Sequence, residues 1–318
     1  MTCTSPFRGA HSAVRVLVGL GILYTALWVI RVIMGVGPNL LLKYLDASPN
    51  VRAYLGSTLN YGVGIAAYLL LPAIALRAVL RLRAPKAFFP FNHGWWKDLL
   101  FGFVVEGLVL SLLFMFEVAA GWLSVESWSW NTIAADALAR TAWVGLLINT
   151  GVAIGEETVF RGYLLTGLKA AIGKWGGLSL MMIVFGLFHL PAYLAAGLES
   201  AGLGLAIVLA TLLGGLFGWI YLRTDSLWLP VSLHFTWNFV ENDLLNLSAD
   251  SGNPNLVGAA TSLQYPLNGA QLGLGGVMML ELLAAVVIAV IIWLWLRGRH
   301  AGIPSSESVQ PFSGQETI

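Results

Sequence analysis

The sequence predicts an all-α membrane protein, a helical bundle of about eight transmembrane helices. Of its 318 residues, 58% are apolar and only 10% are charged, whereas soluble domains carry about a quarter charged residues. Apolar stretches of about 20 residues, the length that crosses a bilayer, recur along the chain. Gly and Pro fall mainly between these stretches, and no repeat of fixed period stands out. These observations together favour one helical bundle.

Eight stretches are candidates for spanning helices: 14–36, 58–80, 98–120, 141–164, 178–197, 203–222, 227–246 and 274–296. The first follows Arg8 and Arg15, as the apolar part of a signal peptide would. No small-residue cleavage motif comes after it and further spans do, so we expect it to be retained. We therefore expect a single integral-membrane domain over residues 1–300 and a polar, disordered tail over 301–318.

The basic residues predict the orientation of the bundle, because Lys and Arg accumulate in cytoplasmic loops. With eight spans, most of them fall on one side of the membrane: Arg8, Arg15, Arg77, Arg81, Arg83, Lys86, Lys97, Lys169, Lys174, Arg223, Arg297 and Arg299. The other side holds Lys43 and Arg52, with Arg140 at a border, and its loop 247–273 has no basic residue. We therefore expect both termini in the cytoplasm.

Composition also excludes some classes of function. The net charge is +1 and no block of like charges occurs, which argues against a nucleic-acid partner. The single Cys3 excludes an internal disulfide framework and a cysteine metal cluster. Membrane lipids are the partners that the composition does predict.

Two adjacent acids stand at the end of a long uncharged stretch. The residues from Thr141 to Gly155 carry no charge and run directly into Glu156 and Glu157, with Arg161 four residues further. On a helix Glu157 and Arg161 can pair on one face, which leaves Glu156 available as a base. The alternative is that all three charges only hold the bundle together. Ionisable groups inside a membrane are expensive, so each is a functional hypothesis.

Two later spans carry histidines. Phe185 and His189 are four residues apart, and Pro191 should interrupt the helix near them. His234 and Asn238 are also four residues apart and share a helix face, where they could hold an oxyanion. A packed, satisfied His189 and a structural hydrogen bond by the second pair are the alternatives. At about 1.5 Å per residue, Glu156, His189 and His234 would lie at similar depths in the cytoplasmic half.

These three motifs resemble those of a known family. Glu-Glu-x-x-x-Arg at 156–161, Phe-x-x-x-His at 185–189 and His-x-x-x-Asn at 234–238 are similar to those of the CAAX-protease and bacteriocin-processing (CPBP) family, which includes the type II CAAX prenyl endopeptidases. The resemblance covers residues 141–246. It implies an intramembrane endopeptidase that acts on a membrane-associated or lipidated peptide or prenylated protein.

The resemblance also implies roles for single residues. Glu156 with His189 would activate the attacking water, and His234 with Asn238 would stabilise the oxyanion. Glu157, Arg161 and Phe185 would support the site. Without the family, amide hydrolysis needs a base, an acid and oxyanion donors, and this set of residues offers all three.

A metal ion is an open alternative. Glu156, His189 and His234 could form a His₂Glu zinc site with an open position, and the family is widely described as metalloprotease-like. However, the sequence has no His-Glu-x-x-His helix, and a Glu/His pair can activate water without an ion. We therefore favour chemistry that requires no cofactor.

Other classes of function compete with the protease. A secondary transporter would also place acids and histidines in the membrane, although such carriers often have internal repeats, and none is found here. A haem protein with His189 and His234 as axial ligands leaves the acids unexplained. A non-catalytic immunity or scaffold protein of the same fold is the third alternative.

Charges outside the motifs predict one more contact. Arg31 in the first span and Glu117 in the third should reach similar depths, so we expect either an ion pair between them or separate anchoring at the interface. Glu106 should share the face of Glu117 and could line the active-site cavity.

Overall fold

The structure, a computed structural model, describes residues 9–78, 80–81, 88–92, 94–121, 125, 131, 133–195, 197, 200–245 and 273–301. These residues form helices and their connections, and none of them lies in a strand. The chain is an all-α polytopic membrane protein. Of the predicted tail, Ala301 is the last residue of a helix, and residues 302–318 lie outside the described residues.

The predicted spans correspond to helices of the structure. The first three are α1 (Ala10–Leu42), α2 (Pro49–Ala78) and α3 (Trp95–Ala119). The fourth is a continuous rod of α5 (Ala135–Glu156), the π-helix η1 (Glu157–Leu165) and α6 (Thr166–Ile172). The others are α7 (Lys174–Phe188) with α8 (Leu190–Ala195), α9 (Ser200–Thr224), α10 (Trp228–Asn238) with the π-helix η2 (Phe239–Leu244), and α11 (Gly273–Ala301).

Seven helical segments in the described part of the chain are long and apolar enough to cross a membrane. The predicted span 227–246 is not among them, because α10 and η2 have only 11 and 6 residues and a crossing needs about 20. This segment is instead largely buried, with eight of the 11 α10 residues buried. Its residues therefore contact protein rather than lipid.

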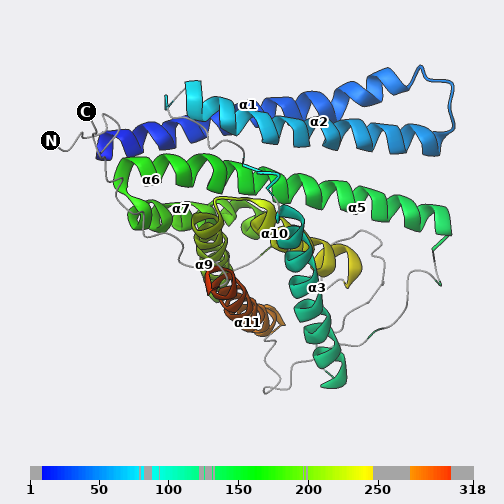
Figure 1. The fold of residues 1–318 in the computed structure, drawn as a ribbon. Coiled ribbons are helices and arrows are strands. Elements are labelled where there is room, and N and C mark those ends of the chain that lie inside the picture. The colour runs from blue at the N-terminus through cyan, green and yellow to red at the C-terminus, as the bar shows by residue number, and fades with distance from the viewer. Residues whose placement is uncertain are drawn as a thin grey trace, which may run out of the picture.

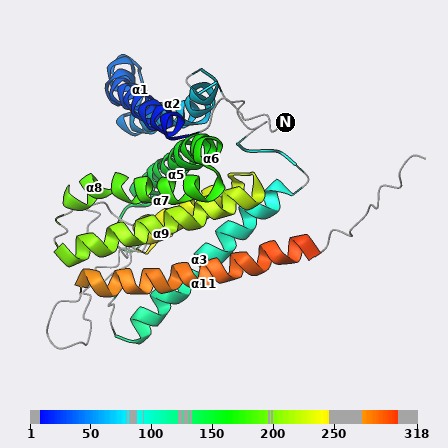
Figure 2. The ribbon, with the colours of Figure 1, turned by 90° about the vertical axis from the view of Figure 1, so that its left-hand side faces the viewer.

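The helices form layers around the rod α5–η1–α6. In Figure 1, α1 and α2 lie side by side above the rod, and α7, α9, α10, α3 and α11 lie below it. Figure 2 shows α9 between α7 and α11, with α3 crossing them. The outer faces are apolar: Val14, Val18 and Ile22 on α1 each expose more than half of their surface. A soluble protein would not expose such a stripe, whereas lipid solvates it.

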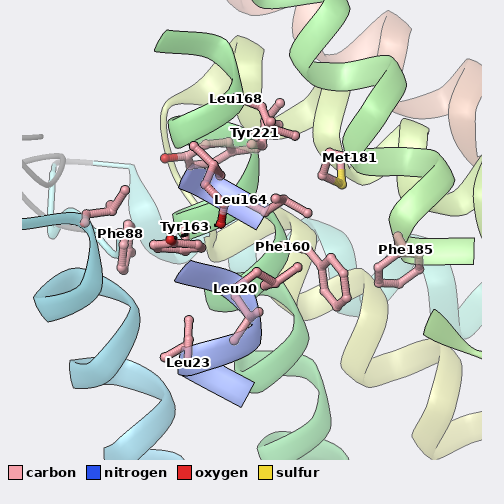
Figure 3. Close-up of a cluster of buried hydrophobic side chains, with 14 of the residues drawn as sticks. Leu20, Leu23, Phe88, Phe160, Tyr163, Leu164, Leu168, Met181, Phe185 and Tyr221 are labelled. Atoms are coloured by element: carbon pink, nitrogen blue, oxygen red, sulfur yellow. Dashed lines mark hydrogen bonds between the residues drawn. The ribbon is translucent and has the colours of Figure 1, made fainter. Parts of the chain in front are cut away.

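The core centres on η1, which is buried along its whole length. Phe160, Tyr163 and Leu164 have no exposed surface, and Figure 3 shows them among side chains of α1, α7 and α9. The Tyr163 hydroxyl donates a hydrogen bond of 3.2 Å to the Val16 carbonyl of α1. This core fixes the position of the residues at the start of η1, where the acids lie.

Glycines bring neighbouring helices close together. Gly102 of α3 faces Ser232 of α10, and a Cβ there would clash with its side chain. Gly218 of α9 faces Met181 of α7 in the same way. Inside a membrane, van der Waals packing between small residues drives helix association. These contacts set α7, α9, α10 and α3 at short separations around the acids.

The expected ion pair between Arg31 and Glu117 is wrong. Arg31 hydrogen-bonds Tyr68 of α2, whereas Glu117 is 3% exposed and faces Glu281 of α11. The physical reason is that α1 packs on α2 and the rod, while α3 packs on α10 and α11 on the other side of the rod. Equal depth in the membrane does not make two helices neighbours.

Glu106 also differs from the expectation. It is 1% exposed, its electrostatic neighbour is Glu241 of η2, and its Oε1 has no hydrogen-bond partner. It therefore belongs to a group of acids with the partly buried Glu241 and Glu281, which share a side-chain hydrogen bond. Neither of these contacts joins Glu106 to Glu156.

Candidate active site

Three side chains from three helices meet at one carboxylate oxygen. Glu156 is the last residue of α5, His189 follows the end of α7, and His234 lies in α10. Glu156 Oε2 is 3.6 Å from His189 Nε2 and 3.9 Å from His234 Nε2. The structure thus brings together residues that are separated by up to 78 positions in the sequence.

The space around this oxygen suits a water molecule. Glu156 Oε2 is buried and accepts no hydrogen bond, and an unpaired carboxylate oxygen is costly to bury. Both distances to the imidazole nitrogens are longer than a direct hydrogen bond, so a water can bridge them. The side chains of Glu156 and His189 are 19% and 23% exposed, so the site is not sealed.

His189 is oriented by the interruption of its helix. The α-helix ends at Phe188, and Pro191 lacks the N–H that would continue it. At this position His189 Nδ1 lies 2.9 Å from the Phe185 carbonyl oxygen. Because a carbonyl only accepts, Nδ1 carries the proton in this contact and Nε2 presents a lone pair to Glu156. The rings of Phe185 and Tyr193 pack beside it, at 4.8 and 5.8 Å.

His234 is oriented by the second acid. Its Nδ1 lies 2.9 Å from Glu157 Oε1, and the same oxygen accepts a hydrogen bond of 3.0 Å from Arg161 Nη1. The pair that the i, i+4 spacing predicts between Glu157 and Arg161 is therefore present, and both side chains have no exposed surface. Glu157 links the two motifs directly.

Arg161 is held on both sides of its guanidinium. Nη2 donates a 3.1 Å hydrogen bond to the Gly214 carbonyl of α9, and the group lies 4.3 Å from the centre of the Phe185 ring. Guanidinium groups stack favourably on aromatic faces, above all when they are desolvated. Phe185 thus supports the site twice, through its ring on Arg161 and its carbonyl on His189.

Asn238 is the last residue of α10 and is half-buried. The four-residue spacing in an α-helix places it on the same face as His234, one turn further along. Its amide can supply a hydrogen-bond donor beside the histidine.

Both helices with a motif change geometry at the motif. The α-helical hydrogen bonding of α5 gives way to η1 directly after Glu156, and α10 gives way to η2 directly after Asn238. π-Helices are rare and occur often at functional sites. The periodicity of apolar residues does not reveal such a change, so the sequence did not predict it.

Glu156, His189 and His234 were also the candidates for a metal site. Among the described residues, no group of three or more His, Cys, Asp or Glu is arranged to hold one. No step of the proposed reaction is derived through a metal.

Two tyrosines near the site lie outside the motifs. Tyr24 of α1 and Tyr68 of α2 are both within electrostatic range of Glu156. The Tyr68 ring packs so closely on Gly155 that an added Cβ would lie 2.9 Å from it. The spacing of Gly151 and Gly155 signals such a close helix contact, and it could have indicated a partner on this face.

Comparison with known proteins finds one similarity, and it covers the segment that contains the site. A family model described as type II CAAX prenyl endopeptidase Rce1-like matches residues 138–240. Searches of curated proteins and of solved structures found no match. The matched interval holds the two acids, both histidines and the asparagine. Residues 138–240 of this chain are therefore similar to the type II CAAX prenyl endopeptidase Rce1-like family.

Proposed function

We propose that this protein is an intramembrane endopeptidase that hydrolyses a peptide bond of a membrane-associated or lipidated peptide or protein. The observation that carries the proposal is the buried Glu156 Oε2, which has no hydrogen-bond partner and lies 3.6 and 3.9 Å from two imidazole nitrogens. This is the arrangement that a base needs around an attacking water.

Glu156 and His189 activate the water in this proposal. The water lies between Glu156 Oε2 and His189 Nε2, which can accept one hydrogen bond each. As the water oxygen attacks the carbonyl carbon of the substrate, Glu156 takes the proton. The Phe185 carbonyl keeps His189 Nε2 turned towards the water, and this orientation contributes to rate by positioning.

His234 and Asn238 stabilise the negative charge that develops on the carbonyl oxygen. The Glu157 carboxylate accepts the Nδ1 proton of His234, so a ring that also carries a proton on Nε2 can donate it to the oxyanion. The Asn238 amide is the second donor. Removing one such donor from an acyl-transfer site typically costs about 10²–10³ in kcat.

The tetrahedral intermediate then collapses. The bond between carbon and nitrogen breaks, and the proton held by Glu156 passes to the departing amine. The products are a carboxylic acid and an amine, and Glu156 returns to its ionised form. The same carboxyl group acts first as base and then as acid, as general acid–base catalysis requires.

Cleavage of defined peptides tests the proposal. The full-length protein, purified in detergent, is incubated with labelled peptides, prenylated and unprenylated, and products are identified by mass spectrometry. We expect cleavage by the wild-type protein and none by Glu156→Ala. Asp136→Asn is the matched control, because this acid is exposed at the far end of α5. Equal product from wild type and Glu156→Ala would overturn the proposal and favour a transporter or a non-catalytic protein.

A further inference from the structure

A hydrogen bond outside the three motifs joins α5 to η2. Asn149 of α5 is buried, and its Nδ2 donates a hydrogen bond of 2.6 Å to Asp243 Oδ2 of η2. The same nitrogen donates a hydrogen bond of 2.8 Å to the Gly145 carbonyl oxygen. An amide nitrogen has two N–H donors, so both are used and the orientation of the Asn149 side chain is fixed. Asp243 lies beyond the residues 138–240 that match the family model.

The two helices approach each other closely at this hydrogen bond. An added Cβ at Gly145 would lie against the Asp243 carboxylate, with its Cγ at 2.8 Å, whereas carbon atoms pack best at about 3.5–4.0 Å. At Gly151, six residues further along α5, an added Cβ would meet its nearest neighbour at 3.7 Å. The absence of a side chain at Gly145 therefore lets the Asp243 carboxylate rest on α5.

This hydrogen bond is the second of two polar contacts between the same pair of helical segments. Glu157 Oε1 and His234 Nδ1, 2.9 Å apart, form the first. Asn149 and Glu157 are eight residues apart on α5, or about 12 Å. His234 and Asp243 are nine residues apart, or about 13.5 Å in α-helical geometry. The segments thus run antiparallel and are joined at both ends of one interval, and Asn238 lies inside that interval.

The π-helix η2 brings Asp243 towards the face that carries Asn238. Residues five apart lie about 140° from each other around an α-helix. In a π-helix the hydrogen bonds join residues five apart, so such residues lie closer to one face. The bond of 2.8 Å from the Leu245 N–H to the Val240 carbonyl oxygen shows this geometry at the end of η2. The change of helix type directly after Asn238 therefore lets the motif face continue to Asp243.

We propose that Asn149 and Asp243 are positioning residues, which hold η2 on α5 and thereby set the Asn238 amide where the oxyanion forms. The inference rests on the proposed endopeptidase function. With the contact between Glu157 and His234 at the other end, the interval that contains Asn238 cannot slide or turn along α5. An oxyanion donor is effective because it is in place before the charge develops. A misplacement of about 1 Å can cost about 10²-fold in rate.

Asp243 acts through its hydrogen bond in this inference, and its charge has no favourable part. A carboxylate near the site repels a developing oxyanion, so the charge alone would slow the reaction. Asp243→Asn removes the charge and keeps an oxygen that can accept the hydrogen bond from Asn149. Asp243→Ala removes both. The pair of variants therefore separates the hydrogen bond from the charge.

Cleavage kinetics in detergent, with a peptide that the wild-type protein cleaves, give the first test. We expect Asn149→Ala and Asp243→Ala each to lower kcat at least about tenfold. KM should change less than about threefold, because the contact affects a charge that forms only after the substrate has bound. Asp243→Asn should keep kcat within about threefold of wild type. Rates are referred to the amount of folded protein, measured by size-exclusion chromatography.

Thr58→Val is the matched control for these variants. It removes another hydrogen bond between α5 and a neighbouring helix, the bond of 3.2 Å from Trp143 Nε1 to Thr58 Oγ1 of α2. This bond does not involve the segment that carries His234 and Asn238. We therefore expect Thr58→Val to change neither kcat nor KM.

A double-mutant cycle on kcat tests whether the effect passes through Asn238. Asn238→Ala removes the donor and should lower kcat by about 10²–10³. If Asn149 acts by placing this donor, adding Asn149→Ala to the Asn238→Ala protein should lower kcat by less than about twofold more. A contact that affects the site in any other way would lower kcat by the same factor in both proteins.

Stability gives a test that does not depend on catalysis. Unfolding of the detergent-solubilised Asn149→Ala, Asp243→Ala and double variants is followed by tryptophan fluorescence. Each single change leaves one partner of the hydrogen bond unsatisfied, so the double variant should lose less stability than the sum of the two. Additive losses would show that Asn149 and Asp243 do not act as a pair, and would overturn the inference.

The two tests separate the possible failures. If wild type cleaves peptides but Asn149→Ala leaves kcat unchanged, or lowers it equally with and without Asn238, the positioning role is wrong and the endopeptidase stands. If Asp243→Asn loses as much kcat as Asp243→Ala, the hydrogen bond is not what matters, and the inference is overturned. If the stabilities are coupled but wild type cleaves no peptide, the proposed activity is wrong, and the positioning role is rejected with it.

Discussion

Two adjacent acids have different surroundings, and the difference assigns them different tasks. Glu157 Oε1 accepts hydrogen bonds from Arg161 and His234, whereas Glu156 Oε2 faces two imidazole nitrogens at longer range. Environment, rather than residue type, separates a structural carboxylate from a reactive one. We therefore expect a conservative change at Glu156 to reduce activity and one at Glu157 to reduce stability.

Glu156→Gln should abolish cleavage and leave the fold intact. The amide has nearly the same shape but cannot take a proton from water, so we expect kcat to fall by at least about 10²–10⁴, the range of a lost general base. Thermal unfolding followed by tryptophan fluorescence should change by no more than about 0.5 kcal/mol, as for changes away from packed features. A Glu156→Gln protein that cleaves at the wild-type rate would exclude Glu156 as the base.

Arg161→Met should instead destabilise the protein. The Glu157 carboxylate, which has no exposed surface, then loses its cationic partner. Breaking a buried pair costs about 3–5 kcal/mol. Glu157→Gln should also destabilise. The double variant should lose less stability than the sum of the two, because neither charge is then left alone. Additive losses in denaturation of the detergent-solubilised variants would show that the two side chains do not act as a pair.

Some residue contacts could be predicted from the sequence and others could not. The Glu157–Arg161 pair lies within one helix, so its spacing alone predicts it. The contact between Glu157 and His234 joins positions 77 apart, and it depends on how α10 packs against the rod. Hydropathy and spacing carry no information about that packing, so only the convergence of the motifs at a similar depth could be expected.

Among the elements, close helix contacts depend on single glycines. Gly102 of α3 has no room for a Cβ, because Ser232 of α10 fills the space. Forcing extra atoms into a packed contact costs about 1–3 kcal/mol. At Gly204 of α9, by contrast, an added Cβ meets nothing within 4 Å. The two glycines therefore form a matched pair for testing how α3 and α10 associate.

Gly102→Ala should lower stability, and Gly204→Ala should leave it unchanged or raise it, since alanine favours a helix over glycine by about 1 kcal/mol. Adding Ser232→Ala should recover part of the loss, because the nearest clashing atom is the Ser232 hydroxyl oxygen. Unfolding midpoints of the three variants in one detergent provide the measurement. Equal effects of the two glycine changes would contradict the close packing of α3 on α10.

Helix positions were largely predictable, and helix geometry was not. Apolar length alone locates α1, α9 and α11, since lipid selects for it along the whole helix. The span 141–164 is in fact part of a 38-residue rod from Ala135 to Ile172. Its extension beyond η1, α6, packs on α1 and α7 and mixes polar and apolar residues. In α6, packing against other helices rather than hydropathy thus determines where the helix lies.

For the whole molecule, the open question is whether α10 and η2 cross the bilayer. We predict eight crossings with both termini in the cytoplasm, because that number places most basic loop residues on one side. Reporter fusions after residues 90 and 260 should then lie on opposite sides of the membrane; residue 260 lies outside the described residues. The same location for both would mean that α10 and η2 enter and return without crossing.

The wrong prediction of an ion pair between Arg31 and Glu117 also concerns the arrangement of the whole molecule. Topology predicts how deep a side chain lies, but not which helices are neighbours around the bundle. The rod α5–η1–α6 stands between α1 and α3, so equal depth did not bring these residues together. Instead, Arg31 lies on the same side of the rod as Tyr68, with which it shares a hydrogen bond and the wall of one pocket.

The π-helix η1 makes the chain sensitive to length as well as to composition. Its hydrogen bonds reach one residue further than those of an α-helix, so it holds more residues than the same axial distance would otherwise need. Deleting one residue between Thr158 and Leu165 would let the rod become α-helical without shortening it much. Because a π-helix has more residues in each turn than an α-helix, the part beyond the deletion would keep nearly its present direction, whereas the side chains within η1 would change position around the axis. Their fit in the buried core would be lost, so evolution can substitute residues here more readily than it can remove one.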